Sequence, residues 1–334
     1  MQIVDNKALV LRTRNPDKYK VIPRMAVVGE SEGIYEVAVK WGLDEVAVLR
    51  NLGVRDVPSP IIARYNWPGR YKPMEHQIET ASFLTTHRRA FVFSEPGTGK
   101  TLSALWAADY LMKAGHVRRC LVLCPVSIMH SAWIGDISNS IIHRSAIVAH
   151  HQQASRRIEM VQGNYEFVIT NYEGLNLIAN EINADGRFDL VIADEANAYK
   201  NVSTKRWKSL NKIIHLGTRL WMMTGTPASQ SPLDAYGLAR LVNPTGVPKF
   251  MTAWRDATML KATQFKWIPK PTAQEQVHAA LQPAIRFTKA QCLDLPPVIT
   301  ETRDVPLTPQ QRKYYHILKE QMLVKAAGET ISAI

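Results

Sequence analysis

The sequence predicts an α/β protein whose main domain is a parallel β-sheet with helices on both faces, accompanied by a small N-terminal α+β module. Two observations predict the sheet. Short apolar runs alternate with longer helical stretches from residue 90 to about 245, as in a parallel sheet that is covered on both faces. Each run also ends in polar or turn residues, at the strand end where such sheets bind ligands. The runs are AFVFSEP (90–96), RCLVLCP (119–125), SAIVAH (145–150), FVITNY (167–172), LVIADE (190–195) and LWMMTGTP (220–227).

Residues 1–66 do not follow this alternation and are expected to form a separate accessory module. KALVLRTRNPDKYKVIPR (7–24) predicts two strands around an Asn-Pro-Asp turn, and IYEVAVKWGLDEVAVLRNLGV (34–54) predicts one or two helices. The first of these segments is basic, which makes the module a candidate for DNA binding, with a solvated basic face as an equal alternative.

Residues 248–297 are expected to form a basic and aromatic helical insertion followed by a linker. PKFMTAWRDATMLKATQFKWIPKP (248–271) interleaves cations with aromatic residues, which suits contact with unpaired bases or, alternatively, a solvated face over a packed subdomain. LDLPPVITETRDVPLTPQQRKYYHILKEQM (293–322) predicts a Pro-rich link, a strand, and a helix capped near Thr308 with Pro309 in its first turn.

The composition is that of a globular protein. The chain has 334 residues, 46% of them hydrophobic and 21% charged, which is enough for two domains with buried cores. A formal charge of +12 would attract a polyanion, although many basic proteins bind no nucleic acid. The three cysteines form no metal-type pair, and no run approaches the ~18 apolar residues of a membrane helix. We therefore expect a soluble, intracellular protein that does not contact membranes.

A phosphate-binding loop is predicted at SEPGTGKT, residues 94–101, between a strand and a helix. Glycines at 97 and 99 let consecutive backbone N–H groups turn toward phosphate oxygens, and the helix N-terminus adds positive potential. Lys100 would reach the β and γ phosphates and Thr101 would offer its hydroxyl to magnesium. The pattern asks for Gly where this chain has Ser94, and the alternative is a Gly-rich turn with an incidental lysine. The expected nucleotide contacts are Pro96, Gly97, Thr98, Gly99, Lys100, Thr101 and Leu102.

An acidic pair ends the apolar run of FDLVIADEANAYKN, residues 188–201. In nucleotide hydrolases of this construction an Asp on a second strand holds the magnesium and a neighbouring Glu orients the attacking water. Asp194 and Glu195 are the candidates for these roles. The alternative is that the acids cap the helix predicted at STKRWKSLNKII (203–214).

Taken in order, these segments resemble a known family. GTGKT, LVLCPVSIMHSAW, VITNYEGL, DEAN and MMTGTP look like motifs I, Ia, Ib, II and III of superfamily-two helicases. MMTGTP, IRFTKAQCLDLPPVI and VPLTPQQRKYY look specifically like the Swi/Snf-related branch of DNA translocases. The resemblance covers residues 71 to about 325. It implies a first RecA-like P-loop NTPase lobe at 67–247, the beginning of a second lobe at 298–334, and ATP with Mg²⁺ as cofactors.

The resemblance also assigns roles to matching residues. YKPMEHQ (71–77) resembles the Q motif, which implies that Gln77 reads adenine and that Tyr71 stacks on it; the alternative for Gln77 is an exposed helix residue. The residues that would touch the DNA backbone, or support those contacts, are Pro125, Ser127 and Trp133 in motif Ia and Thr170, Asn171 and Tyr172 in motif Ib. For Trp133 and Tyr172, core packing is an equal alternative. Motif III, with Thr224, Gly225 and Thr226, would couple the nucleotide site to lobe movement.

Two departures from the family pattern stand out. Asn197 lies where the family usually has a His that links the γ-phosphate site to motif III; Asn can hydrogen-bond but carries no proton charge. Motifs IV to VI, with their arginine fingers, do not occur in these residues. An arginine finger contributes about 10³ to 10⁵ in rate in related enzymes, so the chain is expected to bind ATP but to hydrolyse it poorly alone, as the front part of a longer enzyme.

The hypothesis from the sequence is an ATP-dependent DNA translocase, an ATP hydrolase of helicase type, acting on double-stranded or branched DNA as a monomer. The alternatives are an RNA or single-strand helicase and a truncated, non-enzymatic protein that binds DNA or a partner. The expected location is the cytoplasm, at a nucleoid or a site of viral replication, if the source is prokaryotic or a phage, and the nucleus if it is eukaryotic.

Overall fold

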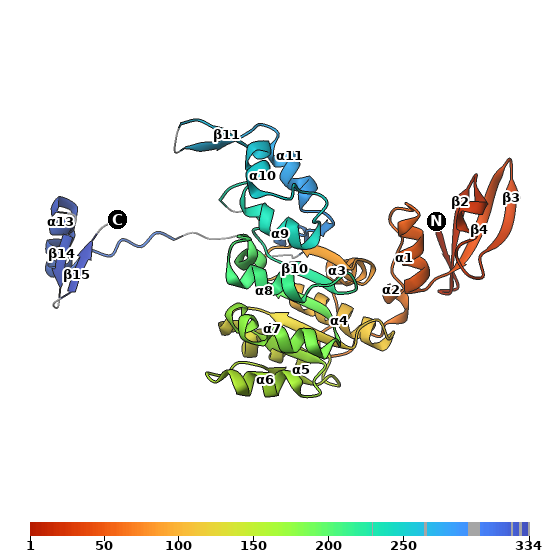
Figure 1. Cartoon of the computed structure of the whole chain (residues 1–334), viewed down its shortest axis with the longest axis horizontal. Coiled ribbons are helices and arrows are strands. Elements are labelled where there is room, and N and C mark those ends of the chain that lie inside the picture. The colour runs from red at the N-terminus through yellow and green to blue at the C-terminus, as the bar shows by residue number, and fades with distance from the viewer. Residues whose placement is uncertain (229, 264–265, 293–300, 322, 327–328, 333–334) are drawn as a thin grey trace. The chain divides into compact units, whose positions relative to one another are not determined.

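The computed structural model of the chain describes residues 1–228, 230–263, 266–292, 301–321, 323–326 and 329–332. It divides into two compact units, Met1–Leu293 and Asp294–Ile334. The larger unit holds a four-stranded, a seven-stranded and a two-stranded sheet with their helices, which Figure 1 shows as ribbons. The domain boundaries drawn from the sequence stay a prediction.

A seven-stranded sheet forms the centre of the larger unit, with the strand order β13-β5-β10-β9-β6-β8-β7. Every pair in it is parallel, so all strands end at the same edge. The six apolar runs of the sequence each contain one strand, as predicted. The strands are β5 (Arg89–Val92), β6 (Arg119–Leu123), β7 (Ala146–Val148), β8 (Phe167–Thr170), β9 (Phe188–Asp194), β10 (Arg219–Met223) and β13 (Ala284–Ile285).

Helices cover both faces of this sheet, because the buried side chains of each strand alternate between two cores. Phe91 packs in one core and Val92 in the other. One face carries α3 (Glu75–Thr86), α4 (Lys100–Lys113) and α5 (Gly135–Ser140). The other carries α6 (Ala154–Gln162), α7 (Tyr172–Asp185), α8 (Lys205–Ile213) and α9 (Asp234–Val242). The predicted α/β architecture with a doubly covered parallel sheet is therefore confirmed.

The N-terminal residues form a second, antiparallel sheet with the strand order β1-β2-β4-β3, followed by the helices α1 and α2. The strands are β1 (Gln2–Val4), β2 (Ala8–Thr13), β3 (Ala26–Ser31) and β4 (Ile34–Lys40), and the helices are α1 (Leu43–Asn51) and α2 (Ile61–Arg64). An α+β module is confirmed, but two of its elements were predicted wrongly. The predicted Asn-Pro-Asp turn lies in the 3-10 turn Pro16–Tyr19, but the second strand predicted after it is wrong, because residues 20–24 form turns. The segment from 34 begins as a strand because its buried residues, Val37, Val39 and Trp41, alternate with the period of two that a strand requires.

Between β10 and β13 the chain forms α10 (Met251–Thr258), a hairpin of β11 (Met259–Lys261) and β12 (Trp267–Pro269), and α11 (Ala273–Ala280). Trp254 is buried, and its indole N–H donates to the carbonyl of Pro232 at 3.1 Å. Trp267 is half-buried with the Arg255 guanidinium over its ring. Packing, the alternative named for these aromatic residues, therefore accounts for both.

The smaller unit contains α13 (Pro309–Gln321), β14 (Leu323–Ala326) and β15 (Glu329–Ser332). Its helix begins as predicted: Thr308 Oγ1 accepts from the N–H of Gln311, and the Gln311 side chain accepts from the N–H of Thr308. The strand predicted before this helix is wrong for residues 301–308, which form no regular element. A strand needs a neighbour, and β14 and β15 pair with each other. The Pro-rich residues 293–300 lie outside the described residues.

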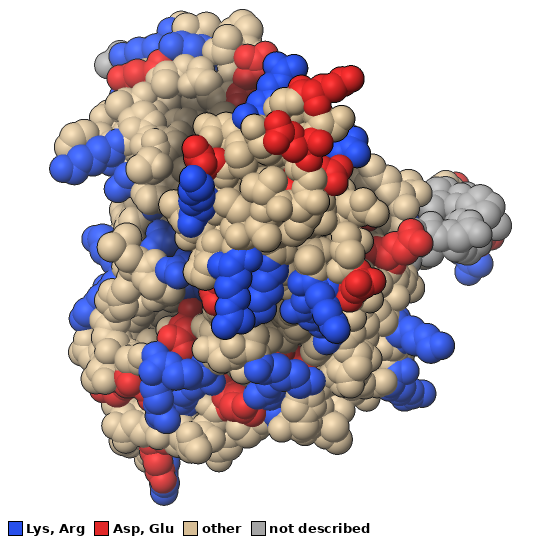
Figure 2. Space-filling view, turned by 90° about the vertical axis from the view of Figure 1, so that its right-hand side faces the viewer, with Lys and Arg blue, Asp and Glu red and all other residues tan. Residues whose placement is uncertain are grey.

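No helix among the residues the structure describes is both long and apolar enough to cross a membrane. On the face drawn in Figure 2, basic side chains recur from top to bottom with acidic ones between them. The basic side chains on this face therefore do not form one single-sign patch.

A buried carboxylate joins α4 to the segments on either side of it. The side chain of Asp109 is fully buried. Tyr65 and Lys113 donate to its Oδ2 at 2.6 and 2.9 Å. His143 and Arg144 reach its Oδ1 at 2.8 and 2.6 Å. Burial raises the pKa of Asp109, but these donors outweigh burial and hold the pKa below its ordinary value.

We predict that Asp109→Asn lowers the free energy of unfolding by about 3–5 kcal/mol, because it leaves buried donors facing an amide. Urea denaturation measures this. The matched control is Asp17→Asn, whose carboxylate is 72% exposed beside Lys20 and should contribute less than about 1 kcal/mol.

The pH dependence of this stabilisation follows from its sign. Since the folded pKa lies below the unfolded one, the stabilisation is complete at neutral pH and is lost as the pH falls below about 4. Equal urea midpoints for the wild type and Asp109→Asn at neutral pH would contradict the prediction.

Candidate nucleotide and magnesium site

The predicted phosphate loop leaves the end of β5 and enters α4 at Lys100. Gly97 and Gly99 both have positive φ, 86° and 76°, a conformation that costs a residue with a Cβ atom about 1–2 kcal/mol. A Cβ on Gly99 would also lie 2.0 Å from Nε2 of Gln77. The backbone conformation therefore favours glycine at this position, and a Cβ atom there would also force the Gln77 amide to move. The strand-loop-helix geometry that presents N–H groups to phosphate is in place.

Lys100 folds back over its own loop. Its ammonium donates to the carbonyl oxygens of Ser94 at 2.8 Å and Glu95 at 3.2 Å. Burial lowers the pKa of Lys100, while the charges of Asp194 and Glu195 act in the opposite direction. The lysine is thus held within electrostatic reach of the acidic pair. The hydroxyl-bearing Thr101 and then Leu102 follow it in the first turn of α4.

Gln77 is buried at 6% exposure, so the alternative of an exposed helix residue is wrong. Its Oε1 accepts from the N–H of Met74 at 3.0 Å, and its Nε2 lies 3.5 Å from the carbonyl of Thr98. The neighbouring His76 Nε2 donates to the same carbonyl at 2.8 Å. The start of α3 is thereby attached to the phosphate loop. Tyr71 lies nearby in sequence and is 46% exposed.

A segment that the sequence did not indicate as part of the site runs along the outer side of the loop, directly after β13. Ser94, the departure from the Gly of the pattern, accepts the N–H of Phe287 through its hydroxyl at 3.1 Å. The N–H of Glu95 donates to the carbonyl of Phe287 at 3.0 Å, and the Glu95 carboxylate accepts the N–H of Lys289 at 2.9 Å. Pairing between residues nearly two hundred positions apart leaves no local signal in the sequence.

This segment also borders a cavity. Met74 and His76 line one part of it, and Arg286, Phe287 and Cys292 line another, around a volume of about 490 Å³. The cavity adjoins the first turn of α3 and the segment after β13.

The acidic pair lies at the end of β9. Asp194 is 7% exposed, while Glu195 is exposed and has a left-handed backbone with φ 48°. Burial raises the pKa of Asp194, and hydrogen bonds from Trp133 and from the N–H of Glu195 oppose this rise. The alternative of a cap on α8 is wrong, because Thr204 caps that helix by accepting the N–H of Trp207. The acids are therefore not used by the following helix.

The residues present fit a magnesium ion. Among the residues that the structure describes, no three or more His, Cys, Asp or Glu side chains form a group that could hold a metal. Magnesium does not need one, since it is usually bound through one or two carboxylates with waters and substrate phosphates. Thr101 and Asp194 supply oxygen atoms of the kind that it prefers.

Asn197 connects the acidic segment to the loop after β10. Its Nδ2 donates to the carbonyl of Thr226 at 2.6 Å and to Oγ1 of Thr226 at 2.9 Å. Thr226 in turn donates its N–H to Oγ1 of Thr224 at 3.3 Å. A Cβ on Gly225 would lie 3.0 Å from Cδ of Pro96 in the phosphate loop. Thr224, Gly225 and Thr226, which are predicted to couple the site to lobe movement, thus lie between the acids and the phosphate loop. Asn197, the fourth residue predicted for coupling, contacts Thr226 through uncharged hydrogen bonds.

The residues predicted to contact DNA fall into two groups. Ser127 is exposed, and Pro125 and Asn171 are half-buried, at the ends of β6 and β8. Asn171 Oδ1 accepts from Arg157 at 3.0 Å. These three are accessible to a ligand at this edge.

The other three are buried, so direct contact with DNA is not what the structure supports for them. Thr170 is 0% exposed, and its hydroxyl donates to the carbonyl of Ala149 at 2.9 Å. Trp133 is 0% and Tyr172 9% exposed, and both point to Asp194. The core-packing alternative therefore holds for Trp133 and Tyr172, because the indole N–H and the phenol hydroxyl both donate hydrogen bonds to Asp194 inside the protein.

A doubly covered parallel sheet with a strand-loop-helix turn of this kind after one strand and a buried acid at the end of another defines the seven-stranded sheet and its helices as a RecA-like α/β fold. The family model described as the SNF2-related domain matches residues 69–333. The chain therefore belongs to the SNF2-related family, as the motifs of the Swi/Snf-related branch predicted.

The similar proteins come from diverse sources. Protein p41 of Acyrthosiphon pisum secondary endosymbiont phage 1 is 25% identical over 278 residues, which is 79% of this chain and 60% of p41. The SWI/SNF-related matrix-associated actin-dependent regulator of chromatin subfamily A-like protein 1 of Xenopus laevis is 24% identical, over 53% of this chain and 18% of its own length. The chain thus spans less than two thirds of either relative. The Sulfolobus solfataricus SWI2/SNF2 ATPase core in complex with dsDNA shares the fold with a TM-score of 0.56 and 21% identity, over 78% of this chain and 56% of that core.

We predict that Gly99→Ala lowers the free energy of unfolding more than Gly115→Ala does. Both glycines have nearly the same positive φ, 76° and 77°, but only Gly99 has a neighbour where the Cβ would lie. Backbone strain should cost each variant about 1–2 kcal/mol, and the contact with Gln77 should add about 1–3 kcal/mol to Gly99→Ala alone. Urea denaturation measures both.

Removal of the Gln77 side chain separates the two causes. In a Gln77→Ala background, Gly99→Ala should cost no more than Gly115→Ala, because only the backbone strain is left. If the two glycine variants lose equal stability with Gln77 present, the contact between Gly99 and Gln77 does not matter.

Proposed function

We propose that this chain is the nucleotide-binding part of an ATP-dependent translocase that acts on double-stranded or branched DNA. One observation carries the proposal: the phosphate loop and Asp194 lie at the same edge of one sheet, with only β10 between their strands. Phosphoryl transfer needs this combination of a cradle for phosphates and acids for a cation and a water molecule.

In the proposed complex, the ammonium of Lys100 exchanges the carbonyls of Ser94 and Glu95 for β- and γ-phosphate oxygens. Thr101 and Asp194 would hold Mg²⁺ through their oxygen atoms, and the cation would supply positive charge beside the phosphates. Glu195 orients the attacking water. Its left-handed backbone turns the exposed side chain away from the buried strand that precedes it. The base would lie near Gln77 and Tyr71, and the cavity lined by Met74 and Phe287 is the candidate space for it.

The proposed coupling uses neutral hydrogen bonds. Asn197 donates twice to Thr226, and Gly225 lies against Pro96 in the phosphate loop. A movement of the phosphate loop on nucleotide binding would therefore be transmitted to the acidic segment through contacts that contain no titratable group. We expect this coupling to vary little between pH 6 and 8, the range in which a His would change charge.

The proposed DNA contact lies at the carboxyl ends of β6 and β8, where Pro125, Ser127 and Asn171 are accessible. Polar groups of this kind contact phosphates and set register without reading bases. The formal charge of +12 adds attraction to any polyanion. The SWI2/SNF2 core in complex with dsDNA, which shares this fold, makes duplex DNA the first ligand to test.

We predict that Lys100→Ala abolishes binding of Mg·ATP in isothermal titration calorimetry, because no other residue of the loop supplies a cation. The matched control is Lys205→Ala, which removes one exposed charge at the start of α8 and should leave the affinity unchanged. Unchanged affinity in Lys100→Ala would exclude this loop as the nucleotide site.

We predict that the chain binds duplex and branched DNA more tightly than single-stranded DNA or RNA of equal length, and that the affinity falls as salt rises. Fluorescence anisotropy measures all four ligands. Ser127→Asp should weaken duplex binding by about three- to tenfold through repulsion of a phosphate, whereas Ser209→Asp on α8 should not. Tighter binding of RNA or single strands would favour the helicase alternative.

A further inference from the structure

Two buried aromatic side chains meet at the end of β9, and both come from segments that follow other strands of the sheet. Trp133 lies in a π-helical turn, Met129–Ile134, which follows β6. Tyr172 is the first residue of α7, which follows β8. Each donates one hydrogen bond to the acidic pair.

Trp133 fixes the carboxylate of Asp194. Its Nε1–H donates to Oδ2 at 3.1 Å, while the N–H of Glu195 donates to Oδ1 at 3.0 Å. An indole can only donate, so it cannot compete with the carboxylate for a cation. With one donor on each oxygen the plane of the carboxylate is set, and the remaining lone pairs are free for another ligand.

Tyr172 fixes the backbone on either side of the same point. Its hydroxyl donates to the carbonyl of Asp194 at 2.6 Å and lies 3.3 Å from the carbonyl of Glu195. In an extended strand, consecutive carbonyls point to opposite sides. The left-handed conformation of Glu195, with φ 48° and ψ 53°, turns them toward one donor. The hydroxyl therefore favours the backbone conformation in which Glu195 leaves the strand.

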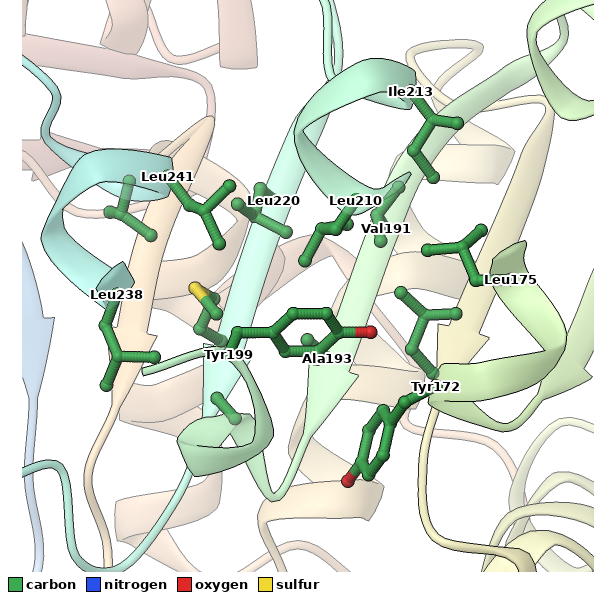
Figure 3. Close-up of a cluster of buried hydrophobic side chains, with 14 of the residues drawn as sticks. Tyr172, Leu175, Val191, Ala193, Tyr199, Leu210, Ile213, Leu220, Leu238 and Leu241 are labelled. Carbon is green, nitrogen blue, oxygen red and sulfur yellow. The ribbon is translucent and has the colours of Figure 1, made fainter. Parts of the chain in front are cut away.

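Tyr199 supports Tyr172 from within the core. Their rings meet edge to face, with centroids 5.5 Å apart at 83°. Figure 3 shows Tyr172 at the margin of this cluster, with its hydroxyl directed away from the aliphatic side chains. The Tyr199 hydroxyl has no hydrogen-bond partner among the residues the structure describes, so its contribution is packing alone.

We propose that Trp133 and Tyr172 are positioning residues: they hold Asp194 in the orientation that binds magnesium and the backbone of Glu195 in the conformation that leaves the strand. The inference rests on the proposed function, because it assumes that Asp194 is the magnesium ligand. Groups that hydrogen-bond to a metal ligand commonly contribute about tenfold or more to metal affinity. Both aromatic residues thereby act through the acids and do not touch the nucleotide.

The test compares Trp133→Phe and Tyr172→Phe, which delete the donors and keep an aromatic ring. Calorimetry measures the affinity for a non-hydrolysable ATP analogue, once with excess Mg²⁺ and once with EDTA. We expect each variant to bind about tenfold more weakly than the wild type with Mg²⁺, and equally well with EDTA. Loss of packing alone would weaken binding in both conditions.

Two control variants delete equivalent groups without touching the acids. Tyr199→Phe removes a hydroxyl from the same cluster. Trp254→Phe removes an indole N–H that donates to the backbone carbonyl of Pro232, just before α9. Both should bind as the wild type does in both conditions.

The possible outcomes distinguish failure of the positioning role from failure of the magnesium site. Equal affinities of the variants and the wild type with Mg²⁺, or equal losses with Mg²⁺ and EDTA, would overturn the positioning role. If the wild type itself binds the analogue no better with Mg²⁺ than with EDTA, the proposed magnesium site fails and the inference fails with it. Should Trp133→Phe not fold, as circular dichroism would reveal, Tyr172→Phe decides the question because a hydroxyl deletion leaves no cavity.

Discussion

Burial of both faces of the seven-stranded parallel sheet is the constraint on which the rest of the structure depends. Because helices cover both faces, polar side chains of the strands are left with the edge where the strands end. The phosphate loop, the acidic pair, the loop after β10 and the exposed residues after β6 and β8 all lie at this edge. These segments lie close together because of the strand order, although they are far apart in the sequence.

Hydrogen bonds between distant segments then turn this proximity into a defined site. Ser94 and Glu95 bond to Phe287 and Lys289, which attaches the segment after β13 to the phosphate loop. The departure of Ser94 from the usual Gly acquires a reason here, since a glycine would offer no hydroxyl to the N–H of Phe287. On the other side of β5, Asn197 bonds to Thr226. A phosphate loop contacted from both sides can transmit a change in its shape in both directions.

Asp194 accepts a hydrogen bond on each of its carboxylate oxygens. A buried carboxylate is costly unless donors satisfy it, and here the donors are an indole and a peptide N–H, with the charge of Lys100 acting in the same direction. The indole donor comes from a segment that the family pattern places near DNA. The same placement gives Tyr172 its contact with the Asp194 carbonyl. Single hydrogen bonds from Trp133 and Tyr172 thus connect the segments after β6 and β8, where DNA is proposed to bind, to the acid proposed to bind magnesium.

The sequence by itself determined the parallel sheet, six of its strands, the strand-loop-helix turn at 94–101 and the family, because these depend on short-range patterns: continuous apolar residues, glycine spacing and motif order. It misjudged residues 34–40, where a period of two was read as helical, and it could not distinguish buried from DNA-facing aromatic residues at Trp133 and Tyr172. Only the tertiary structure decided that both point inward to Asp194, that Gln77 supports the phosphate loop, and that Phe287 borders it. The physical reason is that these roles depend on which strands are neighbours, and strand order is set by the packing of the whole sheet.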